Sequence, residues 1–264
     1  MTPKIAIITL CVGPDYMRAM EPLLESKRQY AKKHGYDFLI GGKDVWDKHR
    51  PVPWSKFNMI HKCMEHYDFL FWSDADSIIL NDEFKLESLI DMLPQEKDIL
   101  WTYDACNHLN NGHMLIRGKS EWVKEFFNRA YSQTDLLYHI WWDNAAMIRL
   151  YETNSIDRSK IETSNQHWLF NAYVFSAKET ANDSSVRLYK HGDFLVHFAG
   201  VYDPLNIYRM ALYLHVCKKK NIDHDPQILD NWRMNVPRTK EVADASLASI
   251  FNLPEANAYF LASL

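Results

Sequence analysis

The hydrophobic positions of this chain fall first into an apolar run and then into a helical repeat. Residues 5–12 are almost continuously apolar and rich in β-branched side chains, which is typical of a strand buried in a parallel sheet. Residues 16–34 carry apolar side chains at helical spacing, and Gly35 follows as a residue that ends helices. Residues 36–40 form a second apolar run. This β-α-β order predicts an α/β fold with a mixed, mainly parallel sheet.

After residue 40 the pattern alternates between polar loops, helices and further strands. Helices are expected over residues 56–66, 86–93, 120–132 and 142–151, the first with Ser55 as its N-cap. Strands are expected over residues 68–72, 99–103, 113–116 and 194–198. Asn110, Asn111 and Gly112 are predicted to form a turn, which an Asn-Gly pair favours. The predicted organisation is a main domain over residues 1–203 and a helical extension over residues 204–264 packed on it.

Composition and charge are those of an ordinary soluble globular protein. Hydrophobic residues make up 47% of the 264 residues and charged residues 24%, with a formal net charge of −4. No basic surplus indicates binding to nucleic acid or to an anionic membrane. The four cysteines are dispersed, which is typical of free thiols in a reducing compartment. No apolar run approaches the roughly 20 residues of a membrane span. We therefore expect a cytoplasmic or membrane-peripheral protein without a transmembrane segment, and the sequence predicts no particular oligomeric state.

Two acidic residues follow the apolar run of residues 68–72. Asp74 and Asp76 are separated by one residue, so on an extended chain their side chains point to the same side. Ligands of open α/β sheets bind outside the carboxyl ends of the strands, where these carboxylates are expected. A hard cation such as Mn²⁺ or Mg²⁺ relieves the repulsion between two carboxylates and also binds a diphosphate. Glycosyl transfer from a nucleotide sugar needs such a cation, because the leaving diphosphate gains charge. The alternative is a solvated turn.

Further polar residues follow other predicted strands. His197 comes directly after an apolar run and can complete a Mn²⁺ shell that carboxylates begin, although a structural histidine is the alternative. Gly200 lets the backbone approach a phosphate closely. Asn110, Asn111 and Gly112 can place amide side chains and an open backbone toward sugar hydroxyls, or simply form the predicted turn.

The segment Trp141-Trp142-Asp143-Asn144 places two indole rings beside a carboxylate and an amide. Sugars stack their C–H faces on aromatic rings, and polar groups bind their hydroxyls. The segment therefore suits a carbohydrate site, and its alternative is core packing with a helix N-cap.

In this order and spacing, the motifs resemble one glycosyltransferase family. That family contains plant xyloglucan xylosyltransferases, plant galactomannan galactosyltransferases and fungal α-mannosyltransferases. The matching stretches, between about residues 4 and 201, are Ile7-Ile8-Thr9-Leu10, Tyr30-Ala31-Lys32-Lys33-His34-Gly35-Tyr36, Trp54-Ser55-Lys56, Phe71-Trp72-Ser73-Asp74-Ala75-Asp76, Leu109-Asn110-Asn111-Gly112-His113-Met114-Leu115-Ile116-Arg117, Trp142-Asp143-Asn144-Ala145-Ala146, Asn171-Ala172-Tyr173, His191-Gly192-Asp193 and His197-Phe198-Ala199-Gly200. The resemblance implies a GT-A fold with a Rossmann-like nucleotide-binding half.

The resemblance also implies an activity and a set of site residues. The activity is retaining, metal-dependent transfer of a hexose or pentose from a UDP- or GDP-sugar to a glycan or other hydroxyl acceptor. The implied ligands of Mn²⁺ (or Mg²⁺) are Asp74, Asp76 and His197, and the residues at the reacting sugar are Asp143 and Asn144. We expect the nucleotide sugar to be bound by Thr9, Leu10, Cys11, Lys56, Ser73, Asn110, Gly112 and Gly200. Loops over residues 43–53 and 153–166 are expected to shape the pocket.

The chain departs from the family pattern at two places. Asn144 stands where the family usually has Gln. Val201 and Tyr202 stand where it usually has Cys and Lys, so another cation must neutralise the phosphate, and Arg209 and Lys190 are the candidates. The membrane anchor and stem typical of eukaryotic members are absent from this sequence, which favours a bacterial or viral enzyme working on the cytoplasmic side, or a shortened form of a longer protein.

Two other functions fit parts of the pattern. A haloacid-dehalogenase-like phosphatase would use Asp74 as its nucleophile, but such enzymes follow the motif with Thr or Val and not with a residue like Ser77. A non-catalytic sugar-binding protein would need neither the carboxylate pair nor a nucleotide.

Overall fold

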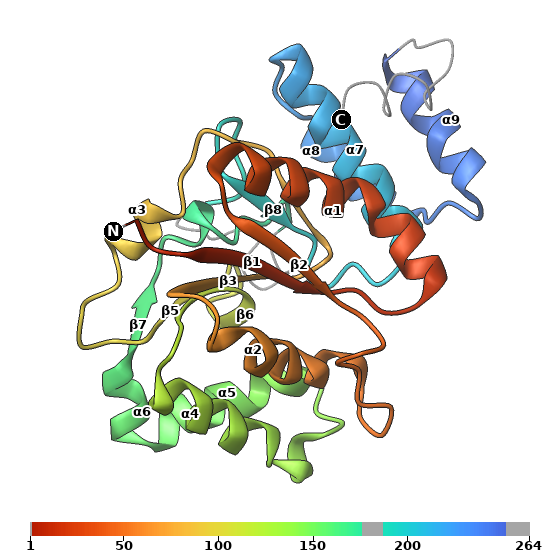
Figure 1. Cartoon of the computed structure of the whole chain (residues 1–264). Helices are drawn as coiled ribbons and strands as arrows, with labels where there is room; N and C mark the ends of the chain where they lie inside the picture. Colours follow the sequence, from red (N-terminus) through yellow and green to blue (C-terminus); the bar gives the residue numbers. More distant parts are fainter. Residues whose placement is uncertain (1, 176–186, 252–264) are drawn as a thin grey trace.

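A six-stranded sheet forms the centre of the computed structural model, which describes residues 2–175 and 187–251, and helices cover both faces of this sheet (Figure 1). The strand order is β2-β1-β3-β6-β5-β7. The strands of this sheet are β1 (Ile5–Leu10), β2 (Asp37–Gly41), β3 (Phe69–Ser73), β5 (Ile99–Tyr103), β6 (Leu109–Arg117) and β7 (Ile161–Ser164). A second, two-stranded sheet pairs β4 (Ser77–Ile79) with β8 (Leu195–His197).

The large sheet is mixed, as the sequence predicts. Strand β1 pairs in parallel with both β2 and β3, and β7 pairs in parallel with β5. Strand β6 runs antiparallel to its neighbours β3 and β5. The expected β-α-β opening is therefore confirmed. The last residue of β3, Ser73, lies opposite His113, so residues 109–112 of β6 extend beyond the end of β3.

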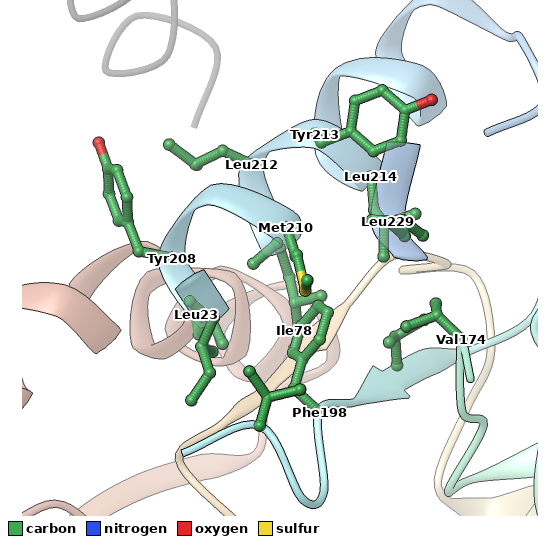
Figure 2. Close-up of a cluster of buried hydrophobic side chains, with 14 of the residues drawn as sticks. Leu23, Ile78, Val174, Phe198, Tyr208, Met210, Leu212, Tyr213, Leu214 and Leu229 are labelled. Atoms are coloured by element: carbon green, nitrogen blue, oxygen red, sulfur yellow. The ribbon is translucent and has the colours of Figure 1, made fainter. Parts of the chain in front are cut away.

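Two layers of helices bury the faces of the sheet (Figure 1). The helices are α1 (Pro14–His34), α2 (Lys56–Met64), α3 (Glu87–Ile90), α4 (Glu121–Tyr131), α5 (Trp142–Thr153), α6 (Ser155–Lys160), α7 (Pro204–Lys220), α8 (Pro226–Met234) and α9 (Lys240–Phe251). On one face, Phe57 of α2 and Phe126 of α4 pack with Trp72 of β3. On the other side, Figure 2 shows Leu23 of α1, Ile78 of β4 and Met210 of α7 gathered in one buried cluster.

Two local predictions are wrong. Asn110, Asn111 and Gly112 lie inside β6 and do not form a turn, because pairing with β3 and β5 outweighs the turn preference of Asn-Gly. Ser55 ends a short 3₁₀ helix (Val52–Ser55) and makes no cap bond to α2. Its hydroxyl instead accepts a hydrogen bond from the Asp47 backbone N–H, at 3.0 Å.

The strand geometry expected for the two aspartates is also wrong. Strand β3 ends at Ser73, and Asp74 and Asp76 belong to the turn that connects β3 to β4. The short strand β4 was not predicted. It pairs with β8 so that Ser77 lies opposite His197, and this pairing brings the histidine to the aspartates.

The predicted loop over residues 153–166 contains α6 and β7. Beyond residue 204 the chain forms α7, α8 and α9, and residues 252–264 of the predicted extension lie outside the described residues. Among the described helices, we find none with the length and hydropathy that crossing a bilayer requires.

Candidate active site

Asp74, Asp76 and His197 form a compact cluster. One ligand atom from each residue lies within 4.8 Å of the others. His197 Nε2 is 3.5 Å from Asp76 Oδ1 and 3.8 Å from Asp74 Oδ2. Carboxylate oxygens and an imidazole nitrogen are ligands that Mn²⁺ accepts, so the donor set fits the cation that the sequence predicts.

The two carboxylates differ in their electrostatic surroundings. Burial raises the pKa of Asp74 above its usual value, while the nearby Lys56 ammonium opposes that shift. Burial also raises the pKa of Asp76, but the charge and hydrogen bond of His197 in its protonated form outweigh this, and the resulting pKa is lowered. A bound cation would favour the ionised form of both groups.

Gly112 makes room for the imidazole of His197. A Cβ atom at Gly112 would lie 2.2 Å from His197 Cε1, far inside van der Waals contact. The residue is in β6 and its φ is not in the left-handed region, so lack of a side chain, and not backbone freedom, is what this position requires.

Lys56 connects the cluster to a second carboxylate. Its ammonium is buried and lies 3.5 Å from Asp74 Oδ1 and 3.1 Å from Asp143 Oδ2. It also donates to the side-chain oxygen of Asn111, at 2.8 Å. Burial lowers the pKa of Lys56, but the two carboxylates outweigh this and raise it above its usual value. The lysine therefore stays positively charged between the two acids.

Asp143 and Asn144 begin α5 beside β6. Asp143 is buried and accepts a hydrogen bond from Asn111 Nδ2 at 2.7 Å. Asn144 donates to the Leu109 carbonyl at 2.9 Å and accepts from the Asn111 backbone N–H at 3.0 Å. The Asn144 amide is thus occupied by the backbone of β6, whereas the Asp143 carboxylate faces the Lys56 ammonium.

The two tryptophans before these residues are not core side chains. Trp141 is 42% exposed and Trp142 is 37% exposed. Trp142 also has a φ of 42°, which is strained for a residue with a large side chain. The alternative of core packing is therefore wrong for this pair.

The residues expected to bind the nucleotide lie at the ends of strands β1 and β3 or in the loop after β8. Thr9 and Cys11 are buried, Leu10 is partly exposed, and the Thr9 hydroxyl has no hydrogen-bond partner among the described residues. Burial raises the pKa of the Cys11 thiol to about 12, so it is not a nucleophile. Ser73 is buried at the end of β3, where its hydroxyl lies 3.1 Å from that of Ser77.

Asn110 and Gly200 occupy different parts of the site. Asn110 donates from Nδ2 to the Tyr173 hydroxyl at 2.9 Å, and this hydrogen bond fixes the orientation of its side chain. Gly200 is exposed in the loop after β8 with a φ of 78°, a conformation that favours glycine.

Arg209, one candidate for neutralising the phosphate, is committed to structural contacts. Its guanidinium donates to Asn206 Oδ1 at 2.8 Å and to the Asn235 carbonyl at 2.7 Å, and it stacks on Trp232. Lys190 is exposed.

Sequence reasoning missed a lysine behind the aspartates. Lys27 of α1 is fully buried and donates a hydrogen bond to the Ser77 carbonyl. Burial lowers its pKa to about 7, and Asp76 and Asp74 oppose that shift. Nothing in the sequence marked it, because a single lysine in an amphipathic helix is normally a surface residue.

Polar residues at the base of the site were missed as well. His113 and Asn171 are fully buried beside His197, and burial lowers the pKa of His113 well below its usual value. Both residues lie in motifs that carry the family resemblance, which was the available signal.

Solved structures with a similar fold are glycosyltransferases. A glycosyltransferase involved in the glycosylation of the major capsid of PBCV-1 has a TM-score of 0.59 at 14% identity, covering 79% of this chain and 98% of its own. The glycosyltransferase GlyE of Streptococcus pneumoniae has a TM-score of 0.52 at 12% identity, covering 95% and 64%. Mouse xyloside xylosyltransferase 1 has a TM-score of 0.50 at 9% identity, covering 75% and 98%. These similarities confirm the GT-A fold.

The sequence comparisons agree with the fold. Residues 2–97 match the model of the galactosyl transferase GMA12/MNN10 family. An α-1,2-galactosyltransferase of Schizosaccharomyces pombe, itself described as uncharacterized, is 25% identical over 217 residues, covering 67% of this chain and 61% of the relative. The probable α-1,6-mannosyltransferase MNN10 of Saccharomyces cerevisiae is 25% identical over 227 residues, covering 67% and 54%.

Together the comparisons confirm the family resemblance that the sequence predicts. The chain spans less than two thirds of the length of either fungal relative. Because these relatives are fungal, the comparison gives no support to a bacterial or viral origin.

Proposed function

We propose that the chain is a retaining, metal-dependent glycosyltransferase. It transfers a hexose or pentose from a UDP- or GDP-sugar to a glycan or another hydroxyl acceptor. The observation that carries this proposal is the cluster of Asp74, Asp76 and His197 at the end of β3 in a GT-A fold. The fungal relatives are described as a galactosyltransferase and a mannosyltransferase, which supports a hexose donor.

The proposed roles follow from the arrangement of charges. Asp74, Asp76 and His197 would hold Mn²⁺ or Mg²⁺, which when bound supplies positive charge for the leaving diphosphate. Asp143 lies beyond the Lys56 ammonium, 3.1 Å away, and is proposed to face the donor sugar. There its negative charge would stabilise the positive charge that develops at the anomeric carbon.

The proposed transfer is a single displacement in which one bond forms, one bond breaks and one proton is transferred. The acceptor oxygen forms a bond to the anomeric carbon on the face from which the nucleotide diphosphate leaves. The bond between that carbon and the diphosphate oxygen breaks, and the acceptor's proton passes to a phosphate oxygen. The incoming and outgoing groups share one face, so the anomeric configuration is retained.

The other site residues predicted from the sequence are proposed to bind the nucleotide sugar. They are Thr9, Leu10, Cys11, Lys56, Ser73, Asn110, Gly112 and Gly200. The free hydroxyl of Thr9 supports a polar contact at the end of β1. Gly112 contributes through the space it leaves for His197, and the Asn144 amide contributes by holding β6. We further propose that residues 1–203 form the catalytic domain and that residues 204–264 are an extension packed on it.

The two alternative functions have less support. A haloacid-dehalogenase-like phosphatase would need a later acidic pair after a strand, whereas the residue that β8 brings to Asp74 and Asp76 is His197. A non-catalytic sugar-binding protein would need neither the clustered carboxylates nor the buried Lys56 ammonium between Asp74 and Asp143.

The direct test is a panel of UDP- and GDP-sugars incubated with the protein and Mn²⁺, with release of the free nucleotide as the readout. We expect release from one donor class and loss of that release with EDTA. Asp76→Asn should lower the rate by at least about 100-fold, since charge stabilisation by a metal contributes several kcal/mol. The exposed Asp91→Asn is the matched control. Full activity in Asp76→Asn would exclude the proposed metal site, and an inverted product anomer by NMR would exclude retention.

A further inference from the structure

A chain of hydrogen bonds fixes the proton positions beneath the proposed metal site. It starts at the backbone N–H of Gly112, which donates to Asn110 Oδ1 at 2.9 Å. A backbone N–H can only donate, so the Asn110 atom that faces it must be the oxygen. Asn171 meets the same Oδ1 at 3.3 Å and must therefore present its NH₂ group there. The opposite atom of the Asn171 carboxamide is then the oxygen.

The Asn171 oxygen faces two imidazole rings. Nδ1 of His113 and Nδ1 of His197 each lie 2.9 Å from Asn171 Oδ1. A carboxamide oxygen has two lone pairs and no proton, so both Nδ1 atoms must carry the proton. All three side chains are buried, and no described group competes for this oxygen at a shorter distance.

The tautomer decides which ring nitrogen is left for a ligand. With its proton on Nδ1, a neutral His197 carries its lone pair on Nε2, the atom that faces Asp74 and Asp76. On the other ring, His113 Nε2 lies 2.9 Å from the Ser77 hydroxyl and 3.1 Å from the Ser73 hydroxyl. Because Ser77 donates its proton to the Asp74 carbonyl at 2.8 Å, the Ser73 hydroxyl is the donor available to this nitrogen. The two histidines thus have the same tautomer, but only the Nε2 atom of His197 faces the carboxylates.

We propose that Asn171 is a positioning residue that holds His197 as its Nδ1–H tautomer and so presents Nε2 to the cation. Histidine ligands of metals commonly donate their second N–H to a fixed acceptor, which sets the ring orientation. The main chain supports this arrangement, since the Ala172 carbonyl accepts from the His197 N–H at 2.8 Å and keeps Asn171 beside β8. The inference rests on the proposed metal site.

The tautomer can be measured in the metal-free chain. Long-range ¹H–¹⁵N NMR of ¹⁵N-histidine-labelled full-length protein at mildly alkaline pH should show His197 with a protonated Nδ1 and a bare Nε2. Asn171→Leu and the smaller Asn171→Ala remove the acceptor, and the single tautomer should give way to a mixture. A wild-type His197 protonated on Nε2 overturns the proposal whether or not either variant folds.

The second readout is Mn²⁺ affinity measured by calorimetry. Removal of the acceptor should weaken binding by about 10- to 100-fold. Asn206→Leu is the control, because Asn206 is also buried and donates to the Trp232 carbonyl at 2.8 Å, away from the cluster. Wild-type affinity in the Asn171 variants overturns the proposal. Lack of Mn²⁺ binding by the wild-type chain contradicts the proposed metal dependence instead, and the tautomer of the metal-free protein still decides what Asn171 does.

Discussion

At the scale of single residues, Lys27 is unexpected because its side-chain amine is fully buried. Its pKa falls from 10.5 to about 7 on folding because of burial. Between these values the unfolded chain binds a proton that the folded chain does not, so the free energy of unfolding should rise with pH. Below about pH 7 both states are protonated, and this contribution becomes constant.

We predict that Lys27→Met removes this pH dependence. For the metal-free wild type, the Lys27 contribution should be about 1.4 kcal/mol per pH unit at most between pH 7 and 9. Denaturant unfolding at a series of pH values measures the slope, and Lys32→Met, an exposed position on the same helix, is the control. Equal slopes in the wild type and Lys27→Met would mean that Lys27 keeps its ordinary pKa in the folded chain.

The close approach of His197 to Gly112 leads to a prediction about steric fit. The methyl group of Gly112→Ala must displace His197 or β6, which should lower the free energy of unfolding by about 1–3 kcal/mol and weaken Mn²⁺ binding. Gly42→Ala is the control, since its Cβ would have an ordinary contact of 3.7 Å with Asp44. Thermal unfolding with and without Mn²⁺ separates the two effects. Unchanged Mn²⁺ binding would show that the imidazole position is not critical.

At the scale of elements, the start of α5 and the residue before it lie between the proposed reacting centre and the protein surface. Asp143 is buried at the start of the helix, whereas Trp141 and Trp142 directly before it are exposed. Exposed indole rings next to a reacting centre suit the C–H faces of an acceptor sugar.

We predict that Trp141→Ala and Trp142→Ala each raise the acceptor KM by about 5- to 10-fold, since one stacked ring contributes roughly 1 kcal/mol. Donor hydrolysis without acceptor should be unchanged, which makes it an internal control. Steady-state kinetics with varied acceptor provide the measurement. Loss of donor hydrolysis in both variants would place these rings at the donor and not at the acceptor.

The sequence predicted the long elements well because their cores are periodic. Residues 16–34 carry enough apolar spacing to identify α1, and residues 99–103 match β5. It missed β4, whose three residues are too short for a pattern, and it placed a turn where β6 runs. Both errors have one cause: strand pairing with distant segments is non-local and outweighs local preference.

The same limit applies to the site. The residues of the metal cluster could be named from motifs, but β4–β8 pairing, which joins Ser77 to His197, could not be foreseen. Lys27 gave no signal, since its burial results from the packing of α1 on β4. Asn144 was predicted as a reacting-sugar contact, and only its hydrogen bonds to β6 reveal a second, structural task.

At the scale of the whole molecule, the site depends on parts far from it. His197 reaches the aspartates through the small sheet of β4 and β8, and that sheet shares one buried cluster with α1 and α7. The two helices lie side by side in Figure 1. Most of α7 is buried, including Met210, which lies in the cluster with Leu23 and Ile78 (Figure 2). The described part of the extension therefore shares a buried core with the elements that carry the proposed site.

We predict that a chain ending at residue 203 does not form the site. Removal of α7 exposes the apolar faces of α1 and β4, so the fragment should lack a cooperative thermal transition and should not bind Mn²⁺. In the full chain, Met210→Asp should act in the same direction, because it places an unpaired carboxylate in the cluster of Figure 2. Met234→Asp changes a residue that is 81% exposed and should leave the melting temperature within a few degrees of wild type. A fragment of residues 1–203 that melts cooperatively and binds Mn²⁺ with wild-type affinity would show that the small sheet positions His197 without α7.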